Sequence, residues 1–428
     1  MEKIYEVADK PERVILIGVS TYENDDTEES LKELKELVKT AGAEVVATVI
    51  QNREVVHSGT YIGKGKLEEV SVLIDELEAT GVVCDDELSP AQLKNLRDML
   101  DTKVMDRTLV ILDIFADRAR TGEGKIQVEL AQLKYRQSRL TGLGKSLSRL
   151  GGGIGTRGPG EKKLETDRRL IRDRIATLRR EIRDMETHRE LARSNREKKP
   201  TTVISIVGYT NAGKSTLLNE LTNAGVVEED KLFATLDPTT RGYKLESGQE
   251  IMLTDTVGFI RKLPHHLVDA FRSTLEEAKY ADILVHVVDV SNPQMDTQMH
   301  IVYDTLKELG VEDKPIITLF NKQDKLREIY QKEEGGKELP VFRDFKADYT
   351  INCSIKKHEG LDELLRTIED IIRNQKIYIV RTFDYKNAGM IQRIRKYGEL
   401  LCEEYRQEGI YVEAYVPVEI ANELTDRR

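Results

Sequence analysis

The sequence predicts a multidomain α/β protein, and three observations lead to this prediction. The chain has 428 residues, of which 39% are hydrophobic and 33% charged, which is enough apolar material for several cores. Short apolar runs alternate with amphipathic stretches over residues 11–125 and again over residues 201–375, as in mostly parallel sheets covered by helices. Residues 126–197 carry heptad-like series instead, which predict a helical hairpin.

The first predicted domain, residues 1–125, begins with the strand VILIGVS (Val14–Ser20) and a helix that ends at Gly42. A strand over Glu44–Ile50 follows, and then the helix LEEVSVLIDELEAT, the strand GVVC, the helix SPAQLKNLRDML and the apolar stretch RTLVILDIFADRA. The segment GKGK (Gly63–Lys66) lacks the full spacing of a phosphate-binding loop. We interpret it as the entry to a helix.

The predicted hairpin, residues 126–197, has two seams of mostly apolar residues spaced by four and three. They are Ile126, Leu130, Leu133, Gln137 and Leu140 in one helix and Ile171, Ile175, Leu178, Ile182 and Met185 in the other. Eight glycines fall between the seams, over Gly142–Gly160. Because glycine is the poorest helix former after proline, this stretch is predicted to be a long loop at the tip of the hairpin.

The charge of the hairpin departs from that of the chain, whose net charge is −10. Residues Ala131–Gly160 include six basic residues and no acidic one, and Lys134–Asp184 holds 15 basic residues against 6 acidic ones. A concentrated basic segment in an acidic protein indicates a local contact with a polyanion. An ordinary solvated loop is the alternative.

The remaining segments are a charged linker, REKKP (Arg196–Pro200), and a small α+β domain over residues 376–428. In the latter we expect the strand KIYIVRTFDYK, a mostly helical stretch AGMIQRIRKYGELLCEEYRQEG broken near Tyr397, and the strand IYVEAYVP. The N-terminus has no signal-peptide core, no apolar run approaches the ~20 residues needed to span a bilayer, and the three cysteines form no CxxC pair. The protein is expected to be a cytoplasmic monomer without a membrane span, with peripheral membrane association left open.

A phosphate-binding loop is predicted where GxxxxGKS occupies Gly208–Ser215, after the apolar run Val203–Val207 and before a helix. This context separates such a loop from a chance glycine turn. Lys214 would reach the β- and γ-phosphates as a catalytic residue, and the Ser215 hydroxyl would bind Mg²⁺. The predicted nucleotide contacts are Gly208, Tyr209, Thr210, Asn211, Ala212, Gly213, Lys214 and Ser215.

The base is predicted to be guanine because NKQD (Asn321–Asp324) follows the strand PIITLF. The Asp324 carboxylate can accept hydrogen bonds from guanine N1–H and N2–H₂, a donor pair that adenine lacks. Four such residues alone could also be a polar helix cap. The predicted contacts around the base are Asn321, Lys322, Gln323, Asp324 and, at the end of the strand YTINCS, Ser354, Ile355 and Lys356.

The γ-phosphate side is predicted at DTVG, which follows the strand EIMLT and comprises Asp255, Thr256, Val257 and Gly258. Asp255 fits the acidic group that supports Mg²⁺ through water, and the Gly258 N–H can face the γ-phosphate. The segment FATLDPTTR (Phe233–Arg241) is the expected first switch. It offers three threonines that could complete the Mg²⁺ coordination, namely Thr235, Thr239 and Thr240.

Two positions depart from the commonest pattern of such sites. Phe259 stands after DTVG, where many small GTPases place a glutamine that orients the attacking water. Phenylalanine cannot do this, so we expect slow intrinsic hydrolysis that a partner accelerates; rapid turnover of the isolated protein would contradict this. Asn211 could hold K⁺ near the phosphates or only stabilise the loop; equal rates in potassium and sodium would argue against the cation.

The motifs VGYTNAGKST, FATLDPTTR, DTVGFI and NKQD, preceded by GGGIGTRGPGEKKLETDRR, resemble those of the HflX-type GTPases, in the Obg–HflX-like superfamily of P-loop GTPases. The resemblance covers nearly the whole chain. It implies a GTPase that binds GTP, GDP, the large ribosomal subunit with its rRNA and the 70S ribosome, and that splits ribosomes into subunits, often under stress. It also implies Thr235 as the first-switch Mg²⁺ ligand, within the nucleotide-contacting run Phe233, Ala234, Thr235, Leu236 and Asp237.

A basic, glycine-rich hairpin tip suits entry into an RNA-lined cavity, because cationic side chains neutralise phosphates and glycines allow close backbone approach. The candidate RNA contacts are Arg139, Lys145, Arg149, Arg157, Lys162 and Lys163. The fold is thus expected to be a P-loop GTPase domain, an N-terminal α/β domain with a long helical hairpin, and a small α+β C-terminal domain. A GTP-regulated switch that binds another protein through the hairpin is the alternative function.

Overall fold

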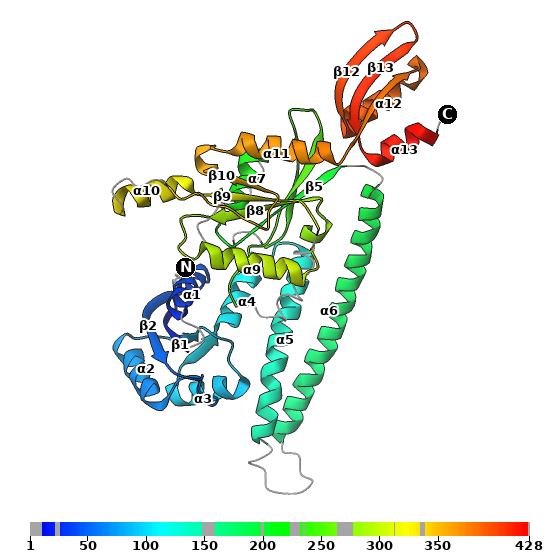
Figure 1. Cartoon of the computed structure of the whole chain (residues 1–428). Helices are drawn as coiled ribbons and strands as arrows, with labels where there is room; N and C mark the ends of the chain where they lie inside the picture. The colour runs from blue at the N-terminus through cyan, green and yellow to red at the C-terminus, as the bar shows by residue number, and fades with distance from the viewer. Residues whose placement is uncertain are drawn as a thin grey trace, which may run out of the picture. The chain divides into compact units, whose positions relative to one another are not determined.

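A computed structural model of the chain (Figure 1) describes residues 11–21, 26–147, 159–197, 201–222, 232–233, 236–262, 277–311, 313–333 and 339–426. The chain divides into two compact units. The first comprises residues 1–183 with the short segments 231–233 and 261–271, and the second comprises the rest. Across the described ranges, none of the helices is long and apolar enough to cross a membrane.

The first unit is built on a parallel sheet of order β2-β1-β3-β4, so the α/β prediction for this region is confirmed. Its strands are β1 (Arg13–Ser20), β2 (Glu44–Asn52), β3 (Gly81–Cys84) and β4 (Lys103–Asp106). The connecting helices are α1 (Thr27–Thr40), α2 (Lys64–Glu76), α3 (Pro90–Leu100) and α4 (Arg107–Arg118). Gly63 is the N-cap of α2, as expected for GKGK, and RTLVILDIFADRA forms α4.

The hairpin consists of α5 (Gly122–Leu147) and α6 (Pro159–Glu197), which lie side by side in Figure 1. The predicted seams meet, since Leu130 packs with Ile175 and Leu178 in one buried cluster. The two helices leave a shorter interval between them than predicted, because α5 continues through two glycines to Leu147 and α6 begins at Pro159. Packing along a helix can outweigh the ~1 kcal/mol that each glycine costs, and proline suits the first turn of a helix.

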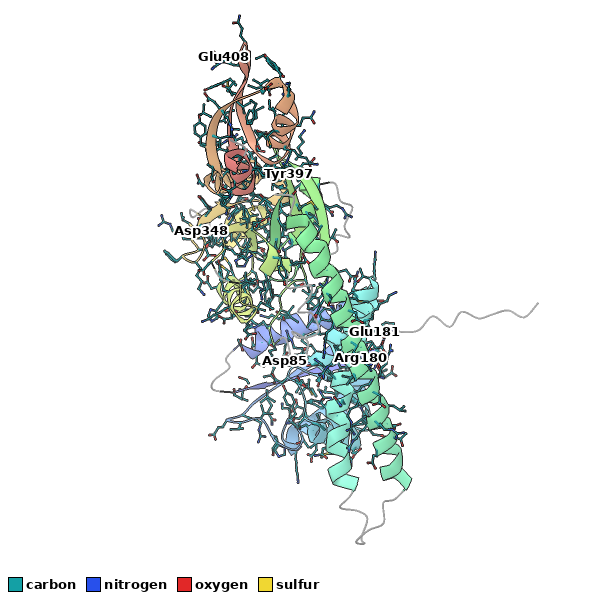
Figure 2. All side chains as sticks on the ribbon, turned by 90° about the vertical axis from the view of Figure 1, so that its right-hand side faces the viewer. Asp85, Arg180, Glu181, Asp348, Tyr397 and Glu408 are labelled. Atoms are coloured by element: carbon teal, nitrogen blue, oxygen red, sulfur yellow. The ribbon has the colours of Figure 1, made fainter. Side chains whose placement is uncertain are left out.

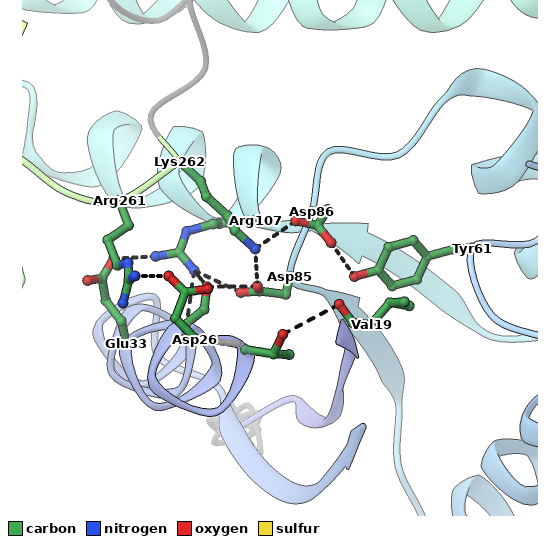
Figure 3. Close-up of polar contacts among 11 residues, drawn as sticks. Val19, Asp26, Glu33, Tyr61, Asp85, Asp86, Arg107, Arg261 and Lys262 are labelled. Atoms are coloured by element: carbon green, nitrogen blue, oxygen red, sulfur yellow. Dashed lines mark hydrogen bonds and ion pairs between the residues drawn. The ribbon is translucent and has the colours of Figure 1, made fainter. Parts of the chain in front are cut away.

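A buried ion network, shown in Figure 3, joins helices α1 and α4 to the end of β3 in the first unit. Arg107 is 1% exposed; its guanidinium contacts the Asp85 carboxylate at 2.8 Å and also the Glu33 carboxylate. Ser30 donates its hydroxyl to Asp85 at 2.7 Å. Burial opposes ionisation of Asp85, but Arg107, Lys262 and the hydrogen bonds outweigh it, so the pKa of Asp85 lies below its ordinary value.

Replacing Arg107 with methionine should destabilise the first unit, because it leaves the buried Asp85 and the half-buried Glu33 without their common cation. Removing one partner of a buried ion pair costs about 3–5 kcal/mol, and Lys262, which still faces Asp85, should hold the loss near the lower figure. Urea unfolding monitored by circular dichroism would measure this loss in the free energy of unfolding. The exposed Arg97→Met is the matched control, and an equal effect of both substitutions would contradict the prediction.

The nucleotide-binding part of the second unit is a six-stranded sheet of order β10-β9-β8-β5-β7-β6, parallel except for the edge strand β6. Its strands are β5 (Thr202–Gly208), β6 (Thr239–Lys244), β7 (Glu250–Asp255), β8 (Ile283–Asp289), β9 (Ile316–Asn321) and β10 (Tyr349–Asn352). The helices are α7 (Lys214–Thr222), α9 (Met295–Glu308), α10 (Gln323–Glu333) and α11 (Leu361–Asn374), with a short 3-10 turn η1 (Ile355–Lys357). Ligands bind at the carboxyl ends of such strands.

The C-terminal part is an antiparallel sheet of order β11-β13-β12, packed on short helices. Its elements are β11 (Ile377–Phe383), η2 (Tyr385–Asn387), α12 (Ala388–Tyr397), β12 (Glu399–Arg406), β13 (Gly409–Val416) and α13 (Val418–Asp426). The expectation of helix beyond Tyr397 was wrong, because ELLCEEYR pairs with β13 as a strand. Here the cross-strand partners outweigh a local sequence that favours helix.

Candidate nucleotide site

The phosphate loop joins the end of β5 to the start of α7 and closes tightly on its neighbours. A Cβ added to Gly208 would lie 2.3 Å from the carbonyl oxygen of Val287, and one added to Gly213 would lie 2.5 Å from Nδ2 of Asn321. Glycine is therefore required at both positions by close approach of other atoms. The loop leads into the N-terminus of α7, where backbone N–H groups and the helix dipole favour an anion.

Lys214 and Ser215, the first residues of α7, face the position that a triphosphate would occupy in such a loop. The Lys214 ammonium is buried and donates to the carbonyl oxygen of Tyr209 at 2.8 Å. Burial lowers the pKa of Lys214 to about 8, with Asp255 opposing this and Lys322 adding to it. The Ser215 hydroxyl donates to the Asp255 carboxylate at 2.8 Å.

The pair of Ser215 and Asp255 fits a magnesium site, because Mg²⁺ in phosphate-loop proteins takes a hydroxyl, an acidic residue through water, and phosphate oxygens. No group of three or more acidic, histidine or cysteine side chains suited to a metal occurs within the described ranges. In phosphate-loop proteins the nucleotide phosphates and water supply the remaining Mg²⁺ ligands. The Thr240 hydroxyl pairs with Thr254 at 2.9 Å, and Thr235 lies outside the described residues.

The residues after Asp255 pack directly on the phosphate loop. A Cβ on Gly258 would lie 2.7 Å from Cα of Thr210 and 3.1 Å from Nζ of Lys214, so any side chain here would displace the loop. Thr210 N–H donates to the carbonyl of Phe259 at 2.8 Å, and Phe259 N–H donates to Gly208 at 3.2 Å. The Phe259 side chain is buried; it binds the loop through its backbone and offers no polar atom to a water.

The predicted guanine loop is braced against the phosphate loop at the end of β9. Asn321 donates to the carbonyl of Ala212 at 2.9 Å, and its side-chain oxygen accepts from the Ile355 N–H at 3.1 Å. The Ser354 hydroxyl donates to Asp324 at 2.7 Å. Burial acts to raise the pKa of Asp324, but this bond and backbone N–H groups outweigh it, so the pKa lies below its ordinary value and the carboxylate stays an acceptor.

Lys322 has an additional partner that the motifs did not reveal. Its ammonium contacts the Asp289 carboxylate at 2.7 Å and donates to the carbonyl of Asn211 at 2.7 Å. Asp289 is the last residue of β8. An acidic residue at the carboxyl end of a parallel strand was therefore the sequence feature that could have revealed this partner. Asn211 has φ +61°, a left-handed conformation that asparagine tolerates. This conformation alone explains why asparagine suits the position, whether or not K⁺ binds there. The potassium role stays a prediction.

Two predicted site residues pack against or pair with side chains of the first unit. Phe233 is buried, and its ring packs edge-on against Phe115 with 4.6 Å between centroids. The expectation that Arg139 contacts RNA was wrong, because its guanidinium is buried, pairs with the Asp106 carboxylate at 2.5 Å and lies over the Tyr135 ring at 4.1 Å. Such a side chain cannot reach an outside phosphate without breaking an internal ion pair.

The other residues proposed for RNA are only partly described. Lys145 lies in α5, and Lys162 and Lys163 lie in α6, whereas Arg149 and Arg157 fall outside the described residues. The structure adds a basic pair that the sequence did not single out, directly after DTVGFI. In the first unit Lys262 contacts Asp85 at 2.5 Å and Asp86 at 2.7 Å, and Arg261 contacts Asp26 (Figure 3).

A phosphate loop, an acidic strand end beside it and a guanine-reading loop, held together on one parallel sheet, define a P-loop GTPase. The profiles described as "GTP-binding GTPase N-terminal", "GTP-binding GTPase Middle Region" and "50S ribosome-binding GTPase" match residues 28–116, 118–196 and 203–322. A GTPase HflX of Lacrimispora saccharolytica is 63% identical over 426 residues, covering 100% of this chain and 98% of that protein. The chain belongs to the HflX family of GTPases and is a GTP hydrolase.

Further similar proteins cover three quarters or more of this chain. GTPase HflX of Caldanaerobacter subterraneus subsp. tengcongensis is 49% identical over 98% of this chain and 94% of its own length. GTPase HflX of Escherichia coli is 43% identical over 75% of each chain. A solved GTP-binding protein of Sulfolobus solfataricus in complex with GDP is 27% identical, with a TM-score of 0.43, over 84% of this chain and 98% of that one.

Proposed function

We propose that this GTPase binds the large ribosomal subunit through its helical hairpin and splits ribosomes into subunits in a GTP-dependent manner, under stress. The observation that carries the proposal is the hairpin itself. Two long helices, α5 and α6, hold an apolar seam between them and bring the ends Leu147 and Pro159 to one tip. The sequence joining those ends is glycine-rich and basic, which suits RNA phosphates.

Polar contacts across the two arms of the hairpin add to their apolar seam. Arg174 of α6 forms a bidentate pair with Glu129 of α5, with both N–O distances at 2.7 Å. Arg168 of α6 also donates to the carbonyl of Leu140. A seam of apolar residues plus contacts across the helices fixes their register.

Mg²⁺ would be held by Ser215, Thr235 of the first switch and the phosphates, and would neutralise charge on the β- and γ-phosphates. Phe259, at the position of the usual water-orienting glutamine, offers no polar side-chain atom to the attacking water. We therefore expect slow intrinsic hydrolysis and a faster rate when the ribosome completes the site.

Sedimentation of 70S ribosomes with the protein and GTP, a non-hydrolysable analogue or GDP tests the proposal, and phosphate release is recorded with and without ribosomes. Free subunits are expected with GTP and with the analogue but not with GDP, together with faster phosphate release on ribosomes. Intact ribosomes under all three conditions would overturn the proposal and favour a switch that acts on another protein.

A set of glutamine substitutions at the tip separates RNA contact from other roles of the hairpin. The tip set is Lys145, Arg149, Arg157, Lys162 and Lys163, and the matched set of exposed residues elsewhere is Lys32, Arg97, Lys307, Lys325 and Arg366. Each lost phosphate contact should flatten the slope of log affinity against log salt by roughly 0.7–0.9. The tip set should flatten it and the matched set should not; equal slopes would refute the RNA contact.

A further inference from the structure

The C-terminal sheet has one face that packs on helices and one face whose side chains are exposed or half-buried. Val412 and Ala414 of β13 point into the buried cluster with α12 and α13. Their neighbours Tyr411, Glu413 and Tyr415 therefore point to the opposite face, since side chains alternate along a strand. The strand pairing then defines a nine-residue patch, which we call the tyrosine face.

The tyrosine face consists of three rows across the sheet. Residues directly opposite one another share a face, and the pairing gives the rows Tyr378–Tyr415–Glu399, Val380–Glu413–Cys402 and Thr382–Tyr411–Glu404. Glu413 is the central residue. Tyr378 is 48% exposed and Val380 is 52% exposed, so the face combines accessible aromatic and apolar surface with one carboxylate in the middle.

Glu413 is held by hydroxyl groups and not by a cation. Tyr411 donates to one carboxylate oxygen at 2.5 Å and Tyr378 donates to the other at 3.3 Å. Among the ion pairs of the described residues, none includes Glu413. The other two carboxylates of the face are paired, Glu399 with Arg373 at 2.5 Å and Glu404 with Arg406 at 2.6 Å.

The same arginines show what kind of group the tyrosine rings accept. The Arg406 guanidinium lies 3.7 Å from the centroid of the Tyr411 ring, and the Arg373 guanidinium lies 5.9 Å from that of Tyr415. Each is thus placed over an aromatic ring and beside a glutamate. Tyr378 and Glu413 offer the same pair of groups, but no arginine of the described chain occupies them.

We propose that the tyrosine face binds an arginine or lysine side chain of a basic protein segment, with its cation on Glu413 and its stem against Tyr378 and Val380. A cation is attracted by the face of an aromatic ring, and a charge-assisted hydrogen bond to the carboxylate adds to this attraction. The central carboxylate argues against RNA as the occupant, because a phosphate backbone would be repelled by Glu413. The proposal does not depend on the ribosome as partner.

Fluorescence anisotropy of a labelled peptide of alternating glycine and arginine, titrated with the full-length protein, tests the proposal. Glu413→Gln removes the charge, keeps one side-chain oxygen as an acceptor and replaces the other with an NH₂ donor, so binding should weaken about tenfold. The matched control is Glu408→Gln, at the turn between β12 and β13 (Figure 2), which removes the same charge outside the face. A citrulline peptide, neutral but of the same shape, should bind weakly to every form.

Three outcomes would overturn the proposal. One is no binding of the arginine peptide to the unaltered protein, and another is equal weakening by Glu413→Gln and Glu408→Gln, which would indicate attraction to overall charge. The third is tighter binding of oligouridylate than of the peptide, with loss on Tyr378→Leu, which would assign the face to RNA. GTP hydrolysis should be unchanged in all variants, since the face lies apart from the nucleotide motifs in sequence and in the sheet that carries it.

Discussion

Asp324→Asn should change the base preference of this GTPase from guanine to xanthine. A carboxylate accepts from guanine N1–H and N2–H₂, whereas an asparagine side chain presents one acceptor and one NH₂ donor. The N2–H₂ donor of guanine would then face the NH₂ donor of asparagine, and the two could not form a hydrogen bond. Xanthine carries a carbonyl in place of N2–H₂, so it restores both hydrogen bonds. A site built to bond a polar group rejects a mismatched analogue strongly, and we expect GTP to bind about 100-fold or more weakly.

The surroundings of Asp324 make this a clean substitution. Its Oδ1 accepts from the Ser354 hydroxyl at 2.7 Å, and an asparagine oxygen can accept the same bond. Competition of GTP and xanthosine triphosphate against a fluorescent nucleotide would give both affinities, with the exposed Asp304→Asn as control. If the variant keeps the GTP preference of the unaltered protein, Asp324 does not read the base.

The motifs of the candidate nucleotide site could be recognised in the sequence because each motif is local. The chain must pass from a parallel strand through a short loop to a helix, and that context identifies Gly208–Ser215 and Asn321–Asp324 without any tertiary information. The helical seams were predictable for the same reason, since a spacing of four and three fixes one face of a helix. Three strands and three helices of the first unit followed from periodicity as well, whereas the short strand β4 (Lys103–Asp106) was not predicted.

The errors arose where distant residues decide the outcome. The strand β12 exists because β13 offers it partners, and a single glutamate-rich segment cannot reveal that. Arg139 was grouped with the basic tip by sequence, yet Asp106, 33 residues away, holds it inside. The contact of Lys262 with Asp85 spans 177 residues. Cationic side chains therefore need their partners known before they can be assigned to a surface.

Lys214→Ala should reduce GTP hydrolysis by about 100- to 1,000-fold, the usual effect of removing one preorganised group that stabilises transition-state charge. The Lys214 ammonium is buried, fixed on the carbonyl of Tyr209 at 2.8 Å, and so is already oriented before the nucleotide arrives. Single-turnover phosphate release would measure the loss, with the exposed Lys307→Ala as control. Activity within about twofold of the unaltered protein would exclude Lys214 from the chemistry.

The same lysine should make GTP affinity depend on pH. Burial lowers the pKa of Lys214 in the free protein to about 8, and bound phosphates favour the charged ammonium and raise that pKa. Above pH 8 binding must therefore take up a proton, so affinity should fall by up to about tenfold per pH unit, whereas below pH 8 it should be constant. Nucleotide titrations between about pH 7 and pH 9 should show this slope in the unaltered protein and lose it in Lys214→Ala. An equal slope in both proteins would assign the titration to another group, because only the charge on Lys214 differs between them.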